Sequence, residues 1–318
     1  MIFDSVDTYA QKRLSKEPSE LQRIGNFDVF TDSENNDNDS EDEIIALCHI
    51  HLALSFTDGT GQPRRGGKYE EATAAALAVQ HFNSRNASNI IADLGASSSA
   101  LLENCPVKLS LEMHDSEFQE SVTVEQVIRA TDRPIDSNHT IRPCAFLGAS
   151  RSAVTLPMSL ITSLRGFPQL SASSTSAALD DTSQYPLFAR TVPADDGTAI
   201  PVIQYMRYTL GIQYMTILNV GDSYGSGYVL GLQLAARRYA PDLFLQQVDI
   251  PVDASQASIN TAVQLLKDTQ NTFFFAIVYP TSTLDAVMTE AYRQGIAGTG
   301  RHNWFFSDAT VRGMRFQK

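Results

Sequence analysis

A repeated alternation of short apolar runs with longer amphipathic segments is the feature that most constrains this fold. It begins with the apolar run IIALCHIHLALSF (44–56), which is followed by a glycine-rich loop and then by KYEEATAAALAVQHFN (68–83). The first run has the length and residue types of a strand, whereas the second segment has those of a helix. The pattern therefore predicts a strand, a loop and a helix.

The same unit recurs along the first half of the chain. Further apolar runs are VKLSLEMHD (107–115), CAFLGA (144–149) and PQLSAS (168–173), and the first two precede helical segments. Short buried strands that alternate with helices are typical of a sheet whose strands run in parallel. We therefore predict a parallel α/β sheet.

The segment LFARTVPADD (187–196) interrupts this rhythm, and a second series starts after it. It opens with the helical segment GTAIPVIQYMRYTLG and continues with the strand candidates YMTILNV, LFLQQVDI, TFFFAIV and NWFFSD. A chain of 318 residues is long enough for two domains of roughly 150 residues each. We predict two parallel-sheet α/β lobes, the first at 44–192 and the second at 193–318.

The residues before the first strand have a different composition. Eight carboxylates and no basic residue lie between Asp28 and Glu43, interleaved with Asn and Ser. Such a stretch buries too little apolar surface to offset the entropy cost of ordering it. We predict that residues 1–43 form a disordered acidic segment.

Charge and hydropathy narrow the classes of partner. The formal net charge is −12, and nucleic acids are polyanions that attract clustered Lys and Arg, so we expect no nucleic-acid partner. No apolar run approaches the roughly 20 residues that span a bilayer. The first residues, MIFDSVDTYAQKR, lack the basic and apolar regions of a secretory signal. We expect neither a signal peptide nor a transmembrane helix within this chain.

Three cysteines stand near the starts of predicted strands. Cys48, Cys105 and Cys144 occupy similar positions in three successive strand units, so they can lie close together at one end of a sheet. A disulfide and buried free thiols both fit this pattern. We favour the free thiols.

Hydroxyl residues gather where predicted strands end. The segment LGASRSAV (147–154) contains a strand end, a glycine turn and a helix start, so its free backbone amides favour a carboxylate. The alternative is ordinary helix capping by Ser150, which leaves Arg151 exposed to solvent. The next strand ends in SASSTS, which adds Ser173, Ser174 and Thr175 at the same edge. A loop whose hydroxyls bond only to one another is the alternative there.

One motif suggests an enzyme. Gly221 to Gly225 fits the G-x-S-x-G pattern of a serine hydrolase, with Ser223 as the nucleophile and His302 and Asp285 in the required chain order. However, His302 precedes a strand, whereas a catalytic base belongs beyond a strand's carboxyl end. Hydrolysis therefore remains the weaker hypothesis.

Metal and nucleotide sites have little support in the sequence. His49 and His51 share one face of a strand, but they have no Cys, Asp or Glu partner nearby, and Cys48 points the opposite way. The glycine-rich loop GTGQPRRGG (59–67) has neither the P-loop nor the dinucleotide spacing. We expect no metal and no cofactor.

Taken in order, these clusters resemble the ligand-binding region of a receptor family that includes natriuretic-peptide receptors and class C G-protein-coupled receptors. The resemblance runs from about Ile44 to Ala309, and it is densest over 167–227, which is similar to metabotropic glutamate and GABA-B receptors. It implies the fold of type I periplasmic binding proteins, in which hinge strands join two lobes that close on a ligand. LFARTVP resembles the first hinge crossing.

The resemblance also implies ligand contacts. Ser152 corresponds to the residue that holds an amino acid's α-carboxylate, and Asp195 to the one that binds its ammonium group. Tyr224 corresponds to an aromatic residue that packs on the ligand. Further contacts fall on Ser173, Ser174, Thr175 and Asp308. Arg151 stands where relatives carry a small residue.

These correspondences predict a function. We expect the extracellular ligand-binding region of a membrane receptor that binds an amino acid or a similar small zwitterion, signals by lobe closure, and is not an enzyme. A module that dimerises, through the first lobe, without binding a ligand is the alternative from the interaction class. The family's second lobe continues beyond the strand at 303–308, so we expect this lobe to be incomplete at Lys318. A membrane-embedded output domain is expected in the full-length protein.

Overall fold

In a computed structural model, the chain divides into two compact units. The first unit comprises Met1–Ser150, Pro157–Ala172 and Gln184–Ala189, and the second comprises Arg151–Leu156, Ser173–Ser183 and Arg190–Lys318. The structure describes residues 22–24, 27–31, 44–57, 69–85, 105, 107–133, 142–279 and 281–307.

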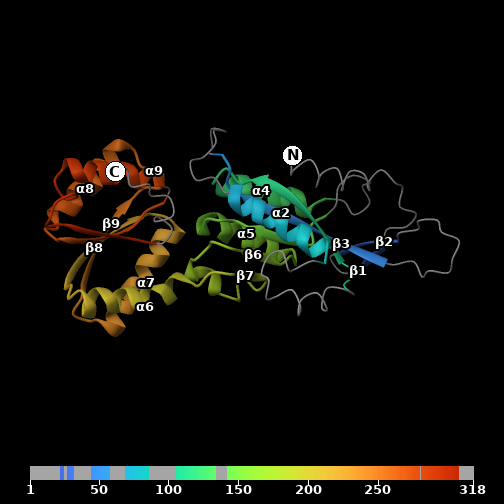
Figure 1. The fold of residues 1–318 in the computed structure, drawn as a ribbon, viewed down its shortest axis with the longest axis horizontal. Coiled ribbons are helices and arrows are strands. Elements are labelled where there is room, and N and C mark those ends of the chain that lie inside the picture. The colour runs from blue at the N-terminus through green and yellow to red at the C-terminus, as the bar shows by residue number, and fades with distance from the viewer. Residues whose placement is uncertain are drawn as a thin grey trace. The chain divides into compact units, whose positions relative to one another are not determined.

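The first unit is built on a sheet whose central strand is β3 (Ile44–Leu54) (Figure 1). The strand β4 (Val107–Asp115) pairs with one edge of β3 in parallel. On the other edge, β5 (Ala145–Gly148) pairs in parallel and is followed by β6 (Gln169–Ser171) and β7 (Phe188–Arg190). Chain order along this sheet is therefore second, first, third, fourth, which is the order of a doubly wound sheet.

Two short strands that the sequence analysis did not predict precede β3, and the disorder of residues 1–43 as a whole stays a prediction. The strands β1 (Gln22–Ile24) and β2 (Phe27–Thr31) form an antiparallel pair, and β2 also pairs antiparallel with residues 44–47 of β3. Because β5 pairs only with residues 50–53 of β3, the amino-terminal half of that edge has backbone groups left for β2. The other residues of 1–43 lie outside the described part of the chain.

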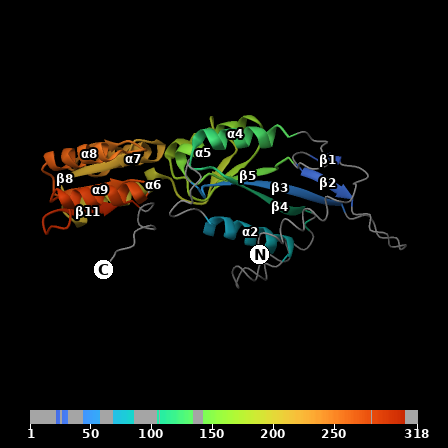
Figure 2. The same ribbon diagram turned by 90° about the horizontal axis from the view of Figure 1, so that it is seen from above.

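Helices cover both faces of the first sheet. Figure 2 shows α2 (Tyr69–Asn83) on one face, and α4 (Glu120–Thr131) and α5 (Ser152–Leu164) on the other. Leu52 and Leu54 of β3 pack against Ala72 of α2. The helix α2 is rich in alanine and has acidic residues in its first turn, which favours helix formation and complements the helix dipole.

The second unit contains a four-stranded sheet in which every strand is parallel to its neighbours. Its order is β11 (Asn303–Phe306), β10 (Phe273–Ile277), β8 (Tyr214–Val220) and β9 (Phe244–Ile250). Read from β9 to β11, the strands come second, first, third and fourth in chain order, as in the first sheet. The central strands β8 and β10 are almost wholly buried, as expected for strands covered on both faces.

Among the described residues of this unit, four helices and two short helical turns accompany the sheet. Figure 1 shows the sheet with α8 and α9 on one side and α6 and α7 on the other. The helix α8 illustrates the pattern: Ser255 caps it by accepting a bond from Ser258 N, and its apolar residues recur at helical spacing. The bounds are Ala177–Asp180 (η3), Asp195–Gln204 (α6), Tyr205–Thr209 (η4), Ser223–Tyr239 (α7), Gln256–Asp268 (α8) and Thr281–Arg293 (α9).

The two sheets confirm the predicted fold class of parallel-sheet α/β units. In such sheets, ligands bind beyond the carboxyl ends of the strands, where the strand order reverses. That reversal lies between β3 and β5 in the first sheet and between β8 and β10 in the second. The carboxyl edges of these strands are therefore where a ligand site is expected. The boundary at 192/193 stays a prediction.

Candidate functional site

The helix α5 begins immediately beyond β5, and its first residue is Ser152. This side chain is buried, and its Oγ accepts a hydrogen bond of 3.2 Å from Ser176 N. One turn later, Thr155 Oγ1 lies 2.6 Å from Ser174 Oγ, and both residues are fully buried. The hydroxyl-rich segment thus bonds to the first turn of α5, and it does so within the second unit.

The same segment also reaches the start of α6. Asp195 is the first residue of that helix and is 2 % exposed, and its backbone N donates to Thr175 O at 2.9 Å. Ser173 and Thr175 are half-buried. One hydrogen-bonded set at two helix starts therefore contains four of the predicted residues, which come from separate positions in the sequence: Ser152, Ser174, Thr175 and Asp195. Whether this set binds a ligand stays a prediction.

Tyr224 lies in the first turn of α7, beyond the carboxyl end of β8. Its side chain is 7 % exposed, its hydroxyl donates to Ser307 Oγ at 2.9 Å, and its ring meets that of Tyr228 edge-on. Ser307 follows β11, so Tyr224 joins two strand ends of one sheet. The predicted Asp308 lies outside the described residues.

A buried ion pair that sequence reasoning did not predict also lies in this region. Arg151 Nε and Nη2 donate to Asp222 Oδ2 at 3.0 and 2.9 Å, and the two side chains are only 9 % and 7 % exposed. The other oxygen of Asp222 accepts a bond of 2.8 Å from Gly225 N and so caps α7. The solvent-exposed Arg151 expected from simple capping by Ser150 is therefore wrong, because Asp222 attracts the guanidinium into the protein.

The serine-hydrolase alternative is inconsistent with the geometry. Ser223 follows the carboxyl end of β8, whereas His302 precedes the amino end of β11 and bonds to Thr299. Because β8, β10 and β11 are parallel, the two side chains lie at opposite edges of the sheet. Even a four-residue strand spans about 13 Å, which is far beyond hydrogen-bonding distance. Ser223 and His302 do not form a triad.

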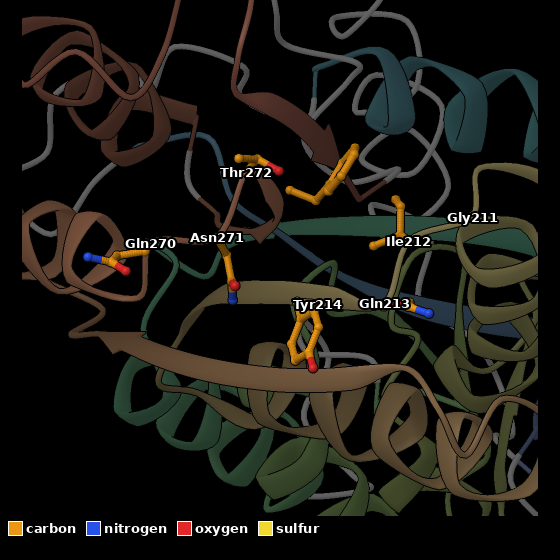
Figure 3. A pocket seen from close by; sticks show the side chains of 8 residues that line it. Gly211, Ile212, Gln213, Tyr214, Gln270, Asn271 and Thr272 are labelled. Carbon is orange, nitrogen blue, oxygen red and sulfur yellow. The ribbon is translucent and has the colours of Figure 1, made fainter.

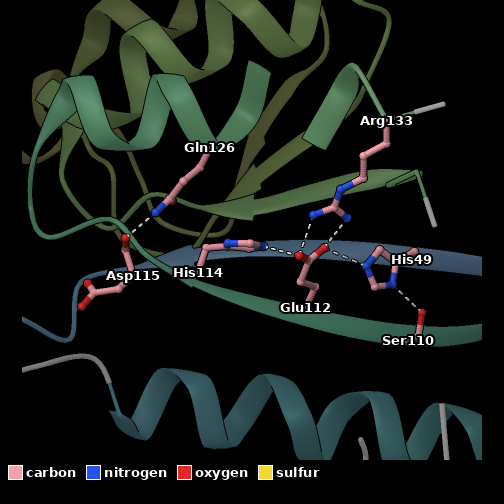
Figure 4. Close-up of polar contacts among 7 residues, drawn as sticks. All are labelled: His49, Ser110, Glu112, His114, Asp115, Gln126 and Arg133. Atoms are coloured by element: carbon pink, nitrogen blue, oxygen red, sulfur yellow. Dashed lines mark hydrogen bonds and ion pairs between the residues drawn. The ribbon is translucent and has the colours of Figure 1, made fainter. Parts of the chain in front are cut away.

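A polar network lies within the first unit on the face of the sheet that α4 covers (Figure 4). Glu112 of β4 accepts from His49 Nε2 at 3.0 Å and pairs with Arg133 and His114. These contacts outweigh its burial and hold the pKa of Glu112 far below its usual range. The statement that His49 and His51 lack an acidic partner is therefore wrong, because β4 supplies one.

Cys48 and Cys144 form a disulfide, with their Cα atoms 5.4 Å apart, and Cys105 is free. The preference for three free thiols is therefore wrong for two of them. The pairing of β3 with β5 brings the two residues together, since Cys144 N also donates to His49 O at 2.9 Å. Disulfides persist in oxidising compartments.

A shallow cavity of ≈ 330 Å³ lies at the amino ends of β8 and β10 in the second unit (Figure 3). It is at the edge opposite to the one where doubly wound sheets bind ligands. We therefore do not assign the amino-acid site to it. Its lining residues are Gly211, Ile212, Gln213, Tyr214, Gln270, Asn271, Thr272 and Phe273.

Among the helices that the structure describes, none is long and apolar enough to cross a membrane. Several known receptors are similar to the chain. It is 29% identical to metabotropic glutamate receptor 6 of Oryctolagus cuniculus and 29% identical to metabotropic glutamate receptor 4 of Mus musculus. Each alignment covers 168 residues, which are 53% of this chain. It covers 19% and 18% of those receptors.

Over 176 residues, 55% of the chain and 20% of the receptor, the identity to metabotropic glutamate receptor 6 of Rattus norvegicus is 28%. The chain thus spans about a fifth of the length of these relatives. The receptor family ligand binding region matches residues 70–318, more than three quarters of the chain. These matches bear out the resemblance seen in the sequence. The chain belongs to the receptor family ligand binding region, as the metabotropic glutamate receptors that it resembles would imply.

Proposed function

We propose that this chain is the extracellular ligand-binding region of a class C-like membrane receptor that binds an amino acid or a similar small zwitterion. In this proposal the ligand lies in a cleft between two lobes, and closure of the lobes is the signal. The family match supports a receptor region, and the relatives' printed names point to glutamate as the first ligand to test. The disulfide supports an extracellular location.

One observation carries the proposal. The starts of α5 and α6 meet in one hydrogen-bonded set through Ser152, Thr175 and Asp195. A helix start favours a carboxylate, because its backbone amides are free and its dipole is positive there. Asp195, whose backbone N donates to Thr175 O in the same hydrogen-bonded set, provides a negative group for an ammonium ion. A carboxylate-binding and an ammonium-binding group are what recognition of an α-amino acid requires.

In the same proposal, the other predicted site residues add contacts to the ligand. Ser173, Ser174 and Thr175 add hydroxyl and amide contacts, Tyr224 packs against the ligand, and Asp308 adds a contact near the strand end. A ligand shifts the lobes towards closure only if it binds the closed state more tightly. Inverting a 1:99 equilibrium to 99:1 requires about 5.5 kcal/mol of such preference, so contacts from both lobes must contribute.

Isothermal titration of the purified chain with L-glutamate, the other proteinogenic amino acids and GABA tests the ligand class. We expect saturable binding of at least one of them. Asp195→Asn should weaken it at least tenfold, because a charge-assisted bond is worth about 1.5–3 kcal/mol. Ser152→Ala should cost only about 1 kcal/mol, because the backbone amides of α5 remain.

His302→Ala, at the far edge of the second sheet, is the matched control and should bind like the wild type. The absence of binding by every amino acid tested would refute the ligand class. If Asp195→Asn binds normally while Ser152→Ala does not, the ammonium site is assigned to the wrong residue.

A module that binds no small molecule is the second candidate, and the ion pair of Arg151 with Asp222 favours it. This pair places the Arg151 cation, already neutralised by Asp222 at the start of α7, next to the start of α5 that a zwitterion would use. The expected result under this hypothesis is a dimer in sedimentation velocity that no amino acid alters. A monomer that responds to a ligand rules it out.

A further inference from the structure

The polar network of the first unit contains three histidines around one carboxylate. The register of β3 and β4 sets His49 opposite Ser110 and His51 opposite Glu112. Because side chains alternate along a strand, these four and His114 lie on the same face of the sheet, the face that α4 covers (Figure 4). The opposite face, towards α2, is apolar. A group of potential metal ligands is thus confined to one side of the sheet.

His51 is the least expected member of this group. Its side chain is 0 % exposed, and neither ring nitrogen has a hydrogen-bond partner among the described residues. Its ring stacks on that of His114 at a centroid distance of 4.1 Å. A buried imidazole without a hydrogen-bond partner needs an explanation, and imidazole is a common metal ligand.

We propose that His51, Glu112 and His114 form a binding site for a divalent transition-metal ion, with Zn²⁺ as the best fit. The ligand atoms of these three residues lie within 4.8 Å of one another. Two imidazoles and one carboxylate suit zinc and its neighbours, whereas calcium prefers six to eight oxygen ligands. Three protein ligands leave a fourth position for water.

Small movements bring the ligands to bonding distance. Zn–N and Zn–O bonds are about 2.0–2.2 Å long, so tetrahedral ligand atoms stand about 3.4 Å apart. The longest separation must therefore shorten by about 1.4 Å, which side-chain rotation can supply. His114 and Glu112 have side chains that are 24% and 26% exposed, so they have room to rotate and give the ion a route from solvent.

Arg133 is the main competitor for the carboxylate. Its Nη1 and Nη2 donate to Glu112 Oε2 and Oε1 at 2.5 and 2.6 Å. A carboxylate has about four acceptor sites, so Oε1 can exchange its contact with His114 for the ion while Oε2 keeps those with Arg133 and His49. His49 Nδ1 in turn lies 2.7 Å from Ser110 Oγ. Such outer partners fix the orientation of a ligand.

Zn²⁺ titration of the metal-stripped chain against a chromophoric chelator tests the proposal, and Co²⁺ serves as a spectroscopic probe. We expect one equivalent to bind, with a cobalt spectrum of nitrogen and oxygen ligation and no thiolate charge-transfer band. His114→Gln should weaken binding more than about 100-fold, beyond the 10- to 100-fold range of outer-shell partners. Ser110→Ala should fall within or below that range.

Two variants separate this site from unspecific binding. His302→Ala removes a histidine of the second unit, and Cys105→Ser removes the free thiol, so both should bind Zn²⁺ like the wild type. Glu112→Gln strands the Arg133 cation and can unfold the unit, so we pair it with Glu112→Gln/Arg133→Met, which replaces both partners. That double variant, if folded by circular dichroism, should also lose binding. The absence of stoichiometric binding, a thiolate band, or unchanged affinity in His114→Gln would overturn the proposal.

Discussion

At the scale of single residues, the pair of Arg151 and Asp222 shows how a sequence motif and a tertiary contact share one side chain. The Asp in Gly-Asp-Ser-Tyr-Gly caps α7 with one oxygen and binds a buried guanidinium with the other. Burying two charges costs solvation free energy that their attraction only partly returns. Removing one partner is therefore far more destabilising than removing both.

Asp222→Asn tests this energetic asymmetry. Asparagine still caps the helix, but it leaves the Arg151 charge buried, so we expect the second unit to lose about 3 kcal/mol of unfolding free energy. Arg151→Met/Asp222→Asn should recover most of this loss. Urea unfolding followed by fluorescence measures it, because Trp304, the only tryptophan in the sequence, lies in β11.

Asp180→Asn is the matched control for that experiment. Asp180 pairs with Arg190 in the same unit, but the Asp180 side chain is 55% exposed, so water screens the pair. The Arg190 side chain is only 9% exposed, but it also donates to Ser176 O at 2.8 Å, so Asp180→Asn should cost less than Asp222→Asn. Equal losses in Asp222→Asn and Asp180→Asn would show that burial of the Arg151 pair has no energetic consequence.

At the scale of elements, the packing of α7 on β8 explains the glycine that made residues 221–225 look like a hydrolase motif. A Cβ added to Gly225 would overlap the backbone carbonyl of Val220, the last residue of β8. The glycine is thus required for close approach of helix and strand. A pattern of five residues cannot distinguish this requirement from that of a catalytic turn.

Gly225→Ala should therefore destabilise the second unit by more than about 2 kcal/mol, because strand or helix must move to relieve the overlap. Gly197→Ala, also in a helix of this unit but with nothing within 4 Å of its added Cβ, should stabilise it by about 0.5–1 kcal/mol. Trp304 fluorescence in urea compares the two variants. The same sign of change in both would contradict this account of Gly225.

At the scale of the whole molecule, the two units repeat one topology, and each has its own core. A disulfide closes a loop with a sequence separation of 96 residues in the first unit only. In the chain-entropy account, a loop of about 100 residues is worth about 4.7 kcal/mol, and measured values are commonly 2–4 kcal/mol. Loss of the disulfide should thus affect the units unequally.

A reducing agent or Cys48→Ala should therefore lower the unfolding midpoint of the first unit. Far-ultraviolet circular dichroism should show this as a shift of only part of the signal change. The Trp304 transition, which reports the second unit, should stay unchanged, and Cys105→Ser should leave both transitions unchanged. A shift of the Trp304 midpoint on reduction would mean that the two units unfold as one cooperative system.

The sequence by itself determined the α/β class, the two series of strands and helices, the family, and the clustering of hydroxyl residues at strand ends. The α/β class and the two series follow from local periodicity, because the spacing of apolar residues fixes which segments are strands and which are helices. The family follows instead from the resemblance that is densest over residues 167–227. The strands at 22–24 and 27–31 escaped prediction because they depend on a free edge of β3.

Only the tertiary structure decided the contacts between distant residues. His51 meets Glu112, Cys48 meets Cys144, and Arg151 meets Asp222 across separations of 61, 96 and 71 residues. Strand register and order set the first two encounters, and a shift of one residue would turn His51 to the other face of the sheet. The third encounter joins the residue before α5 to the residue that caps α7. Local sequence patterns do not determine which distant residues come into contact, so the histidine network and the buried ion pair could be identified only from the tertiary structure.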